Sequence, residues 1–194
     1  MITGLIALMG FARYLSRAVY PILVWEIAVP NLGLATQSGM VEASAGVAAI
    51  LAGLVLGRLA DRFRIVKLGV TCSLLGGIFR LPQGFLRSLG QLIPLRFLGD
   101  FWAAGLDPIL HTLLARRVPP QKRGTAFGLA GSAKALGQAL GSFGGDTVAA
   151  LFSIRAAFIA GSLCFGFLTL LIGLQAEGLR RPQPLGVMER GRLE

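Results

Sequence analysis

The fifteen residues GLVLGRLADRFRIVK (Gly53–Lys67) decide the fold, because they place a cluster of charges between two long apolar runs. The ten residues before Gly57 are almost wholly apolar, and the run LGVTCSLLGGIF follows directly after Lys67. The charges between these runs are one acid and four bases: Asp61, Arg58, Arg62, Arg64 and Lys67. This pattern is typical of a short hairpin that joins two membrane-spanning helices on the basic side of a bilayer.

The composition of the whole chain indicates an integral membrane protein. Of its 194 residues, 54% are hydrophobic and 14% are charged, with a net charge of +10 and a mean hydropathy of +0.70. Soluble domains carry about 25% charged residues. The bases flank apolar runs, which favours a membrane over a nucleic acid as the partner. The sequence shows no cofactor motif, no phosphate-binding loop and no metal-ligand spacing, so we expect neither a cofactor nor ATP-driven transport within this chain.

Six apolar segments are long enough to cross a bilayer, which needs about 20 residues per helix. They are 3–27, 38–60, 66–86, 89–114, 124–151 and 152–174. We therefore predict an all-α membrane domain of six transmembrane helices over residues 1–175. Residues 176–194 are polar and contain four arginines, and we expect them to form a basic cytoplasmic tail.

The bases give the predicted orientation, because Lys and Arg collect in cytoplasmic loops. Twelve of the nineteen lie in three segments after the second, fourth and sixth spans: the hairpin above, residues 116–123 and the tail. The opposite loops hold three, Arg80, Arg87 and Arg155. Both termini should therefore be cytoplasmic, in what we expect to be the plasma (inner) membrane. The other four bases fall inside predicted spans.

The hairpin also has features of a conformational latch, that is, a contact that holds the helix ends in one conformation and releases them in another. Gly53 and Gly57 are four residues apart, a spacing of small residues that lets another helix approach closely. Asp61 follows on the same face, where a carboxylate can pair with bases or with the N-terminus of a neighbouring helix. An ordinary basic loop is the alternative, and the residues alone do not decide between the two.

The hairpin resembles a motif of the major facilitator superfamily, G-x-x-x-D-R-x-G-R-x-K/R. Gly57, Asp61, Arg62 and Lys67 match it, and Arg64 stands where the family usually has glycine. The resemblance implies a gating motif made of Gly53, Gly57, Asp61, Arg62 and Lys67.

Three further stretches resemble family motifs in the same order along the chain. PPQKRGTAFG (Pro119–Gly128) resembles the second cytoplasmic hairpin, and LIPLRFLGDFWAA (Leu92–Ala104) the fourth-helix motif, with Asp100 in place of its central glycine. GQALGSFGGD (Gly137–Asp146) resembles the fifth-helix antiporter motif, which implies that Gly137, Gly141 and Gly145 serve helix packing. The resemblance points to the drug-efflux branch. Members of the family have about twelve helices in two halves, so we expect this chain to equal one half, with a C-terminal half favoured.

Ionisable side chains inside the bilayer mark functional positions, because each costs about 2.5–3.5 kcal/mol to insert. At about 100° per residue, the four on the fourth predicted helix fall within about 60° of arc. They are Arg96, Asp100, Asp107 and His111. Arg96 and Asp100 have the spacing of an ion pair, and a buried structural pair is the alternative to a coupling role. Asp107 adjoins Pro108, which interrupts helical hydrogen bonds.

The first predicted helix carries a similar stripe, Arg13 and Arg17, for which Asp100 and Asp107 are the expected partners. Lys134 lies deep in the fifth span. The resemblance implies that the first and fourth helices line a central cavity. We therefore expect cavity or coupling roles for Arg13, Arg17, Arg96, Asp100, Asp107, His111 and Lys134. For Lys134, a contact with a partner half is the alternative to a role in the cavity.

Three classes of function compete. The favoured one is secondary transport of a small solute by alternating access, coupled to protons through a membrane carboxylate and completed by a homodimer or by a second six-helix half. The second is a membrane enzyme, which we do not expect, because phosphatidyltransferase and rhomboid-type protease signatures are absent from the sequence. The third is a non-transporting membrane subunit, or a truncated fragment, that pairs with another six-helix chain.

Overall fold

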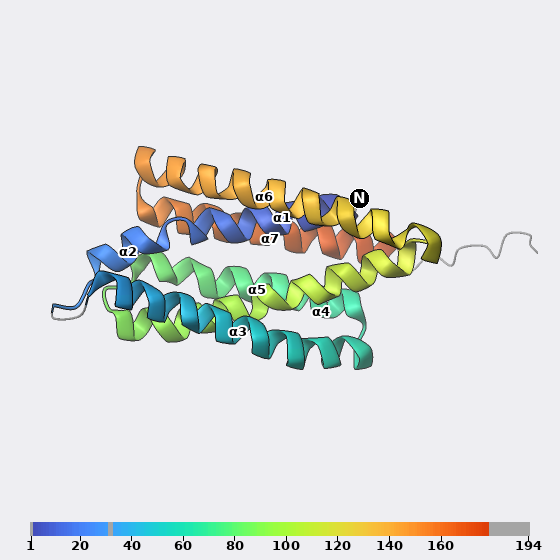
Figure 1. The fold of residues 1–194 in the computed structure, drawn as a ribbon, viewed down its shortest axis with the longest axis horizontal. Coiled ribbons are helices and arrows are strands. Elements are labelled where there is room, and N and C mark those ends of the chain that lie inside the picture. Colours follow the sequence, from blue (N-terminus) through green and yellow to red (C-terminus); the bar gives the residue numbers. More distant parts are fainter. Residues whose placement is uncertain (1, 31–32, 179–194) are drawn as a thin grey trace, which may run out of the picture.

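The structure is a computed structural model that describes residues 2–30 and 33–178 (Figure 1). These residues form helices and contain no strand, so the predicted all-α class is confirmed. The helices are α1 (Ile2–Arg17), α2 (Tyr20–Glu26), α3 (Leu34–Arg62), α4 (Ile65–Arg80), the 3₁₀ helix η1 (Leu81–Phe85), α5 (Leu89–Arg117), the 3₁₀ helix η2 (Pro120–Lys122), α6 (Arg123–Leu151) and α7 (Ile154–Gly178).

In this part of the chain, four segments are long and apolar enough to cross a membrane. They are Ile2–Glu26, Leu34–Ala60, Ile65–Phe85 and Ile154–Leu174. Helices α5 and α6 are as long as α3, at 29 residues each. Their charged side chains and many glycines lower their hydropathy, so the count of six spans stays a prediction.

Two of the predicted spans are not continuous α-helices. The first changes direction between α1 and α2, where Pro21 lies in the first turn of α2 and the Val19 N–H bonds to the Ser16 carbonyl at 3.3 Å. Proline has no N–H to continue the ladder of α1. The third span ends as η1, which also has a proline in its first turn.

The predicted boundary between membrane domain and tail falls inside a helix. Helix α7 continues to Gly178, past the expected start of the tail at Ala176. The rest of the predicted tail, 179–194, lies outside the described residues. The turn between α6 and α7 is as tight as the sequence suggests, with only Phe152 and Ser153 between the helices.

The helices pack as two groups that lie side by side along their length. Helix α1 packs on α6 and α7, and α5 packs on α3 and α4. Contacts of α4 and η1 with α7 join the groups, and α1 meets α5 between them (Figure 1). Their shared core includes Ile6 and Met9 of α1, Leu106 and Ile109 of α5, and Leu168 of α7, all fully buried.

Helix α6 approaches α1 through glycine. Gly137, Gly141 and Gly145 are buried, and a Cβ added to them would collide with the backbone carbonyls of Ala7, Phe11 and Leu15 respectively. Both sets repeat every four residues, so one ridge of α1 fits against a row of glycines on α6. Small residues at such a contact let two helices pack closely by van der Waals contact.

One end of the bundle collects the basic loops. The start of α1, the α3–α4 turn, the α5–α6 turn and the end of α7 all lie at the right of Figure 1. The bases of the two turns are exposed there: Arg58, Arg62, Arg64, Lys67, Arg116, Arg117, Lys122 and Arg123. The basic loops thus share one end, and the prediction that this end faces the cytoplasm remains a prediction.

Candidate functional site

Charged side chains from five helices, α1, α3, α4, α5 and α6, meet between the two helix groups. The first cluster forms around Asp107 of α5, which holds one base from each of two neighbouring helices. Arg13 of α1 donates to its carboxylate at 3.1 Å, and Lys134 of α6 pairs with the other oxygen. The two carboxylate oxygens therefore tie α5 to α1 and to α6 at once.

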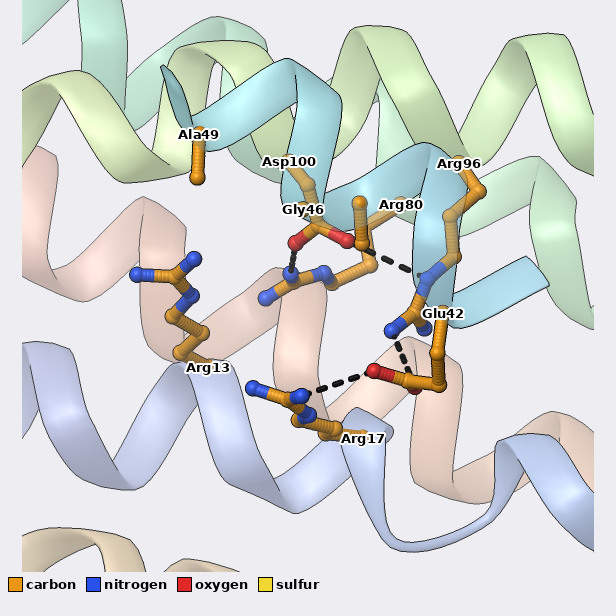
Figure 2. A pocket seen from close by; sticks show the side chains of 9 residues that line it. Arg13, Arg17, Glu42, Gly46, Ala49, Arg80, Arg96 and Asp100 are labelled. Carbon is orange, nitrogen blue, oxygen red and sulfur yellow. Dashed lines mark hydrogen bonds and ion pairs between the residues drawn. The ribbon is translucent and has the colours of Figure 1, made fainter. Parts of the chain in front are cut away.

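A second carboxylate, Glu42 of α3, bridges two arginines. Arg17 of α1 and Arg96 of α5 each donate to one of its oxygens at 2.7 Å (Figure 2). The Arg17 and Glu42 side chains stay 42% exposed, whereas Arg96 is almost fully buried. Glu42 thus joins α1, α3 and α5 at the open side of the site.

The third carboxylate, Asp100 of α5, lies deepest and is bound by two buried arginines. Arg80, the last residue of α4, donates to it at 2.8 Å, and the Arg96 Nε lies 3.2 Å from its other oxygen. The side chains of this triad are between 1% and 6% exposed. A lone charge here would be costly, and the mutual pairing offsets much of that cost.

Aromatic rings and a buried amide support the triad. The Arg96 guanidinium lies 3.4 Å from the centre of the Tyr20 ring, and that of Arg80 lies 4.9 Å from the centre of the Phe165 ring. The Tyr20 hydroxyl pairs with Gln83, whose amide donates to the carbonyls of Phe79 and Leu95 at 2.8 and 3.0 Å. The break after α1 and the 3₁₀ turn η1 place Tyr20 and Gln83 for these contacts.

These groups border a cavity of about 130 Å³. Figure 2 shows the four arginines and two carboxylates around it, with α1 on one side and α3 on the other. Its lining residues are Arg13, Arg17, Glu42, Ala45, Gly46, Ala49, Arg80, Arg96 and Asp100. The small side chains of α3 leave the space open, and the charged side chains of α1, α4 and α5 surround it.

The structure brings together most of the residues for which the sequence predicts a cavity or coupling role. Arg13, Arg17, Arg96 and Asp100 line the cavity, and Asp107 and Lys134 are linked to it through Arg13. Arg17 pairs with Glu42 and not with either predicted aspartate. His111 lies apart, with its ring centre 5.7 Å from that of Phe127.

The residues of the expected gating motif lie at the basic end, away from the cavity. Arg62 and Lys67 are exposed, and the Asp61 side chain lies outside the described part of the structure. A Cβ at Gly53 or Gly57 would have no atom within 4 Å among the described residues, so the expected close helix contact does not occur within this bundle. Arg64, which replaces the usual glycine, has φ −62° and ψ 110°, a conformation open to any residue.

Two members of the site, Arg80 and Glu42, do not stand out in the sequence. Arg80 closes an apolar run and is predicted as a loop residue, yet its side chain is 1% exposed. Glu42 lies near the start of the second predicted span, where a charged side chain can reach water. The sequence does contain one signal of a missing acid. The bases within the predicted spans outnumber the acids of the fourth predicted helix, so a further acidic partner is needed.

The fold and the site together define a class of protein: a helical membrane protein with a polar site buried between its helices. The family model of the Major Facilitator Superfamily matches residues 6–189, and the chain belongs to this family. The predicted family and its membrane character are confirmed. At the level of the family, the match also supports a transporter rather than an enzyme.

Several known multidrug proteins are similar to this chain. The multi-drug resistance efflux pump PmrA homolog of Lactococcus lactis subsp. lactis (strain IL1403) is 33% identical over 129 residues, which cover 65% of this chain and 31% of that protein. Multidrug resistance protein MdtG of Dickeya zeae (strain Ech586) is 34% identical over 145 residues, 73% of this chain and 36% of that protein. MdtG of Klebsiella pneumoniae (strain 342) is 29% identical over 172 residues, 86% of this chain and 42% of that protein. The chain thus spans less than half the length of these relatives.

Proposed function

We propose that this chain forms one half of a secondary transporter that exports or exchanges a small solute by alternating access, driven by protons. The observation that carries the proposal is the ion-pair network around the cavity. Three carboxylates and five bases from α1, α3, α4, α5 and α6 meet in the interior of the helix bundle, a region that we place within the membrane. Charges are retained at such depth where they serve a substrate or ion pathway.

Asp107 is the proposed coupling carboxylate. It pairs with Arg13 of α1 and Lys134 of α6, both in the other helix group, and its side chain is 25% exposed, so a proton can reach it. Protonation would neutralise the carboxylate and release both bases. The released charges would then favour a different arrangement of α1 and α6 against α5, which is the kind of bistable element that alternating access requires.

A second six-helix unit is part of the proposal, either another copy of this chain or a separate half. Helix α3 presents the exposed side chains of Val47, Ile50, Leu54 and Val55. Gly46, Gly53 and Gly57 on the same helix have no neighbour within reach of an added Cβ among the described residues. The mass of the protein extracted in nanodiscs, corrected for lipid, counts the chains, and a strict monomer would contradict a completed transporter.

We further propose that all six helical segments, including α5 and α6, span the inner membrane with the basic end in the cytoplasm. The charges of α5 oppose insertion of that helix alone. Asp100 and Asp107 are both paired with bases in the folded bundle, which supports a transmembrane position for α5.

Proton-driven efflux from cells that express the chain tests the proposed function. The cells are loaded with one cationic and one anionic fluorescent dye, and efflux is followed with and without a protonophore. We expect export that stops when the proton gradient collapses. Asp107→Asn should abolish export and leave the amount of membrane-inserted protein unchanged.

The matched control for this experiment is Asp146→Asn. Asp146 is an exposed aspartate on α6, far along the helix from Lys134, and its loss should leave export intact. Equal export by the wild type and Asp107→Asn would contradict the coupling role, and no export of either dye by the wild type would count against transport by this chain.

A further inference from the structure

The charge balance of the site is positive. Five bases and three acids are joined in the network or line the cavity, which leaves an excess of two positive charges. Four of the bases are arginines, which stay protonated in proteins. Because the five bases share three carboxylates, a net charge of at least +1 remains even when Lys134 is neutral. An uncompensated charge within the membrane is costly, and a bound anion would remove that cost.

The two most buried arginines have hydrogen-bonding capacity to spare. Nε and Nη1 of Arg80 and Nη1 of Arg96 have no hydrogen-bond acceptor among the described residues. Both side chains are at most 2% exposed, and both line the cavity. A guanidinium binds carboxylate and phosphate oxygens with two parallel hydrogen bonds, so these free donors favour an oxyanion.

The size of the cavity limits what enters it. A volume of about 130 Å³ is well below the roughly 300–1,000 Å³ of a site that encloses a drug-sized ligand. It suits one charged group with a few waters. Arg17 and Glu42, both 42% exposed, form its accessible rim. The rest of a larger solute would therefore lie outside, along the open side between α1 and α3.

We infer that this cavity binds the oxyanion group, a carboxylate or a phosphate, of an acidic solute. The inference rests on the proposed transport function and adds its substrate class. Glu42 acts as a competitor in this proposed binding. Its carboxylate holds Arg17 and Arg96 while the cavity is empty and competes with the solute for them.

Isothermal titration of the purified chain in nanodiscs of phosphatidylcholine tests the inference. The probes are benzoate, inorganic phosphate and the lipophilic cation tetraphenylphosphonium. We expect at least one of the two anions to bind and the cation not to displace it. Arg80→Gln should weaken binding about tenfold or more, as expected for loss of a charge-assisted hydrogen bond.

Other variants separate a binding defect from a folding defect. Arg13→Gln removes a cavity base whose side chain is 15% exposed, and it should weaken binding about tenfold even if Arg80→Gln does not fold. Glu42→Gln removes the competing carboxylate and should tighten binding several-fold, a change that misfolding does not produce. Arg155→Gln, an exposed arginine outside the cavity, is the matched control and should bind as the wild type does.

The outcomes distinguish the solute class from the transport function. Binding of the cation alone, or anion binding that Arg13→Gln leaves unchanged, would overturn the oxyanion site, while dye export in the cell experiment would still support transport. If anions bind in phosphatidylcholine but phosphatidylglycerol in the nanodisc abolishes that binding, the oxyanion site is supported and a lipid headgroup, not a solute, occupies it. Anion binding without any export would support the site and contradict the proposed transport.

Discussion

Asp100 shows most clearly how single residues stabilise this site, because two arginines reach it from different helices. Arg80 and Arg96 each lie within 3.2 Å of its carboxylate, and all three side chains are buried. Removing one partner of such a group leaves a charge without compensation, which typically costs 3–5 kcal/mol. Removing Asp100 together with one of its arginines leaves a smaller unbalanced charge, because one charge of each sign is lost.

We therefore predict strong coupling between Arg80 and Asp100. Arg80→Gln and Asp100→Asn should each lower the free energy of unfolding by about 3 kcal/mol. The double variant should be less destabilised than the sum of the two, since the neutral pair leaves no unbalanced charge at that contact. Denaturation of the detergent-solubilised variants measures the three values, and strictly additive losses would contradict a coupled pair.

The sequence predicts some of these side chains and misses others for a physical reason. Arg13, Arg96 and Asp107 lie well inside apolar runs, where helical spacing alone shows a common face. Arg80 and Glu42 lie near the ends of their runs, where a charged side chain can reach water, and so the sequence favours a loop. Only packing shows that Arg80 instead turns inward and lies over the Phe165 ring.

At the scale of the helices, the contact between α1 and α6 depends on the absence of side chains. An added methyl group at Gly141 would meet the backbone of Phe11, which is rigid helix and not a flexible side chain. The two helices would have to move apart along this row. Overpacking of this kind typically costs 1–3 kcal/mol.

We predict that Gly141→Ala lowers the thermal stability of the detergent-solubilised protein by an amount equal to about 1–3 kcal/mol. The matched control is Gly131→Ala, on the same helix, where an added Cβ would have no atom within 4 Å. It should be neutral or slightly stabilising, because alanine favours helix over glycine. Melting curves compare the thermal stability of the two variants with that of the wild type. Equal effects of the two substitutions would contradict a close α1–α6 contact.

The bounds of the long helices follow from hydropathy, but their interruptions do not. Each predicted span coincides with a helical segment within a few residues. The break before Pro21 and the 3₁₀ turn η1 have apolar sequences on both sides, so a hydropathy pattern passes over them. Yet these two breaks position Tyr20 against Arg96 and Gln83 against Tyr20, and so the details of the site depend on them.

At the scale of the whole molecule, the two ends of the bundle differ in charge. The eight exposed bases of the α3–α4 and α5–α6 turns lie at one end. The described loops at the other end carry Glu26, Arg87 and Arg155 as exposed charged residues. Basic loops tend to stay in the cytoplasm during insertion, so we expect the basic end to face the cytoplasm.

We predict opposite accessibility for a cysteine placed at each end. In a background without Cys72 and Cys164, Arg87→Cys should react with a membrane-impermeant maleimide added to intact spheroplasts. Arg117→Cys should react only after the membrane is permeabilised. Mass spectrometry of the labelled protein gives the fraction modified, and the reverse pattern would mean that the basic end faces outward.

The pairing of Arg13 with Asp107 also has a consequence for the order in which the protein is made. The two residues are 94 positions apart, whereas Arg17 and Glu42 are only 25 apart. During synthesis, the carboxylate that pairs with Arg17 becomes available once the start of α3 has been translated. Arg13 must wait until most of α5 has been translated. We therefore expect the bilayer insertion of α1 to be completed only when α5 supplies the counter-charge of Arg13.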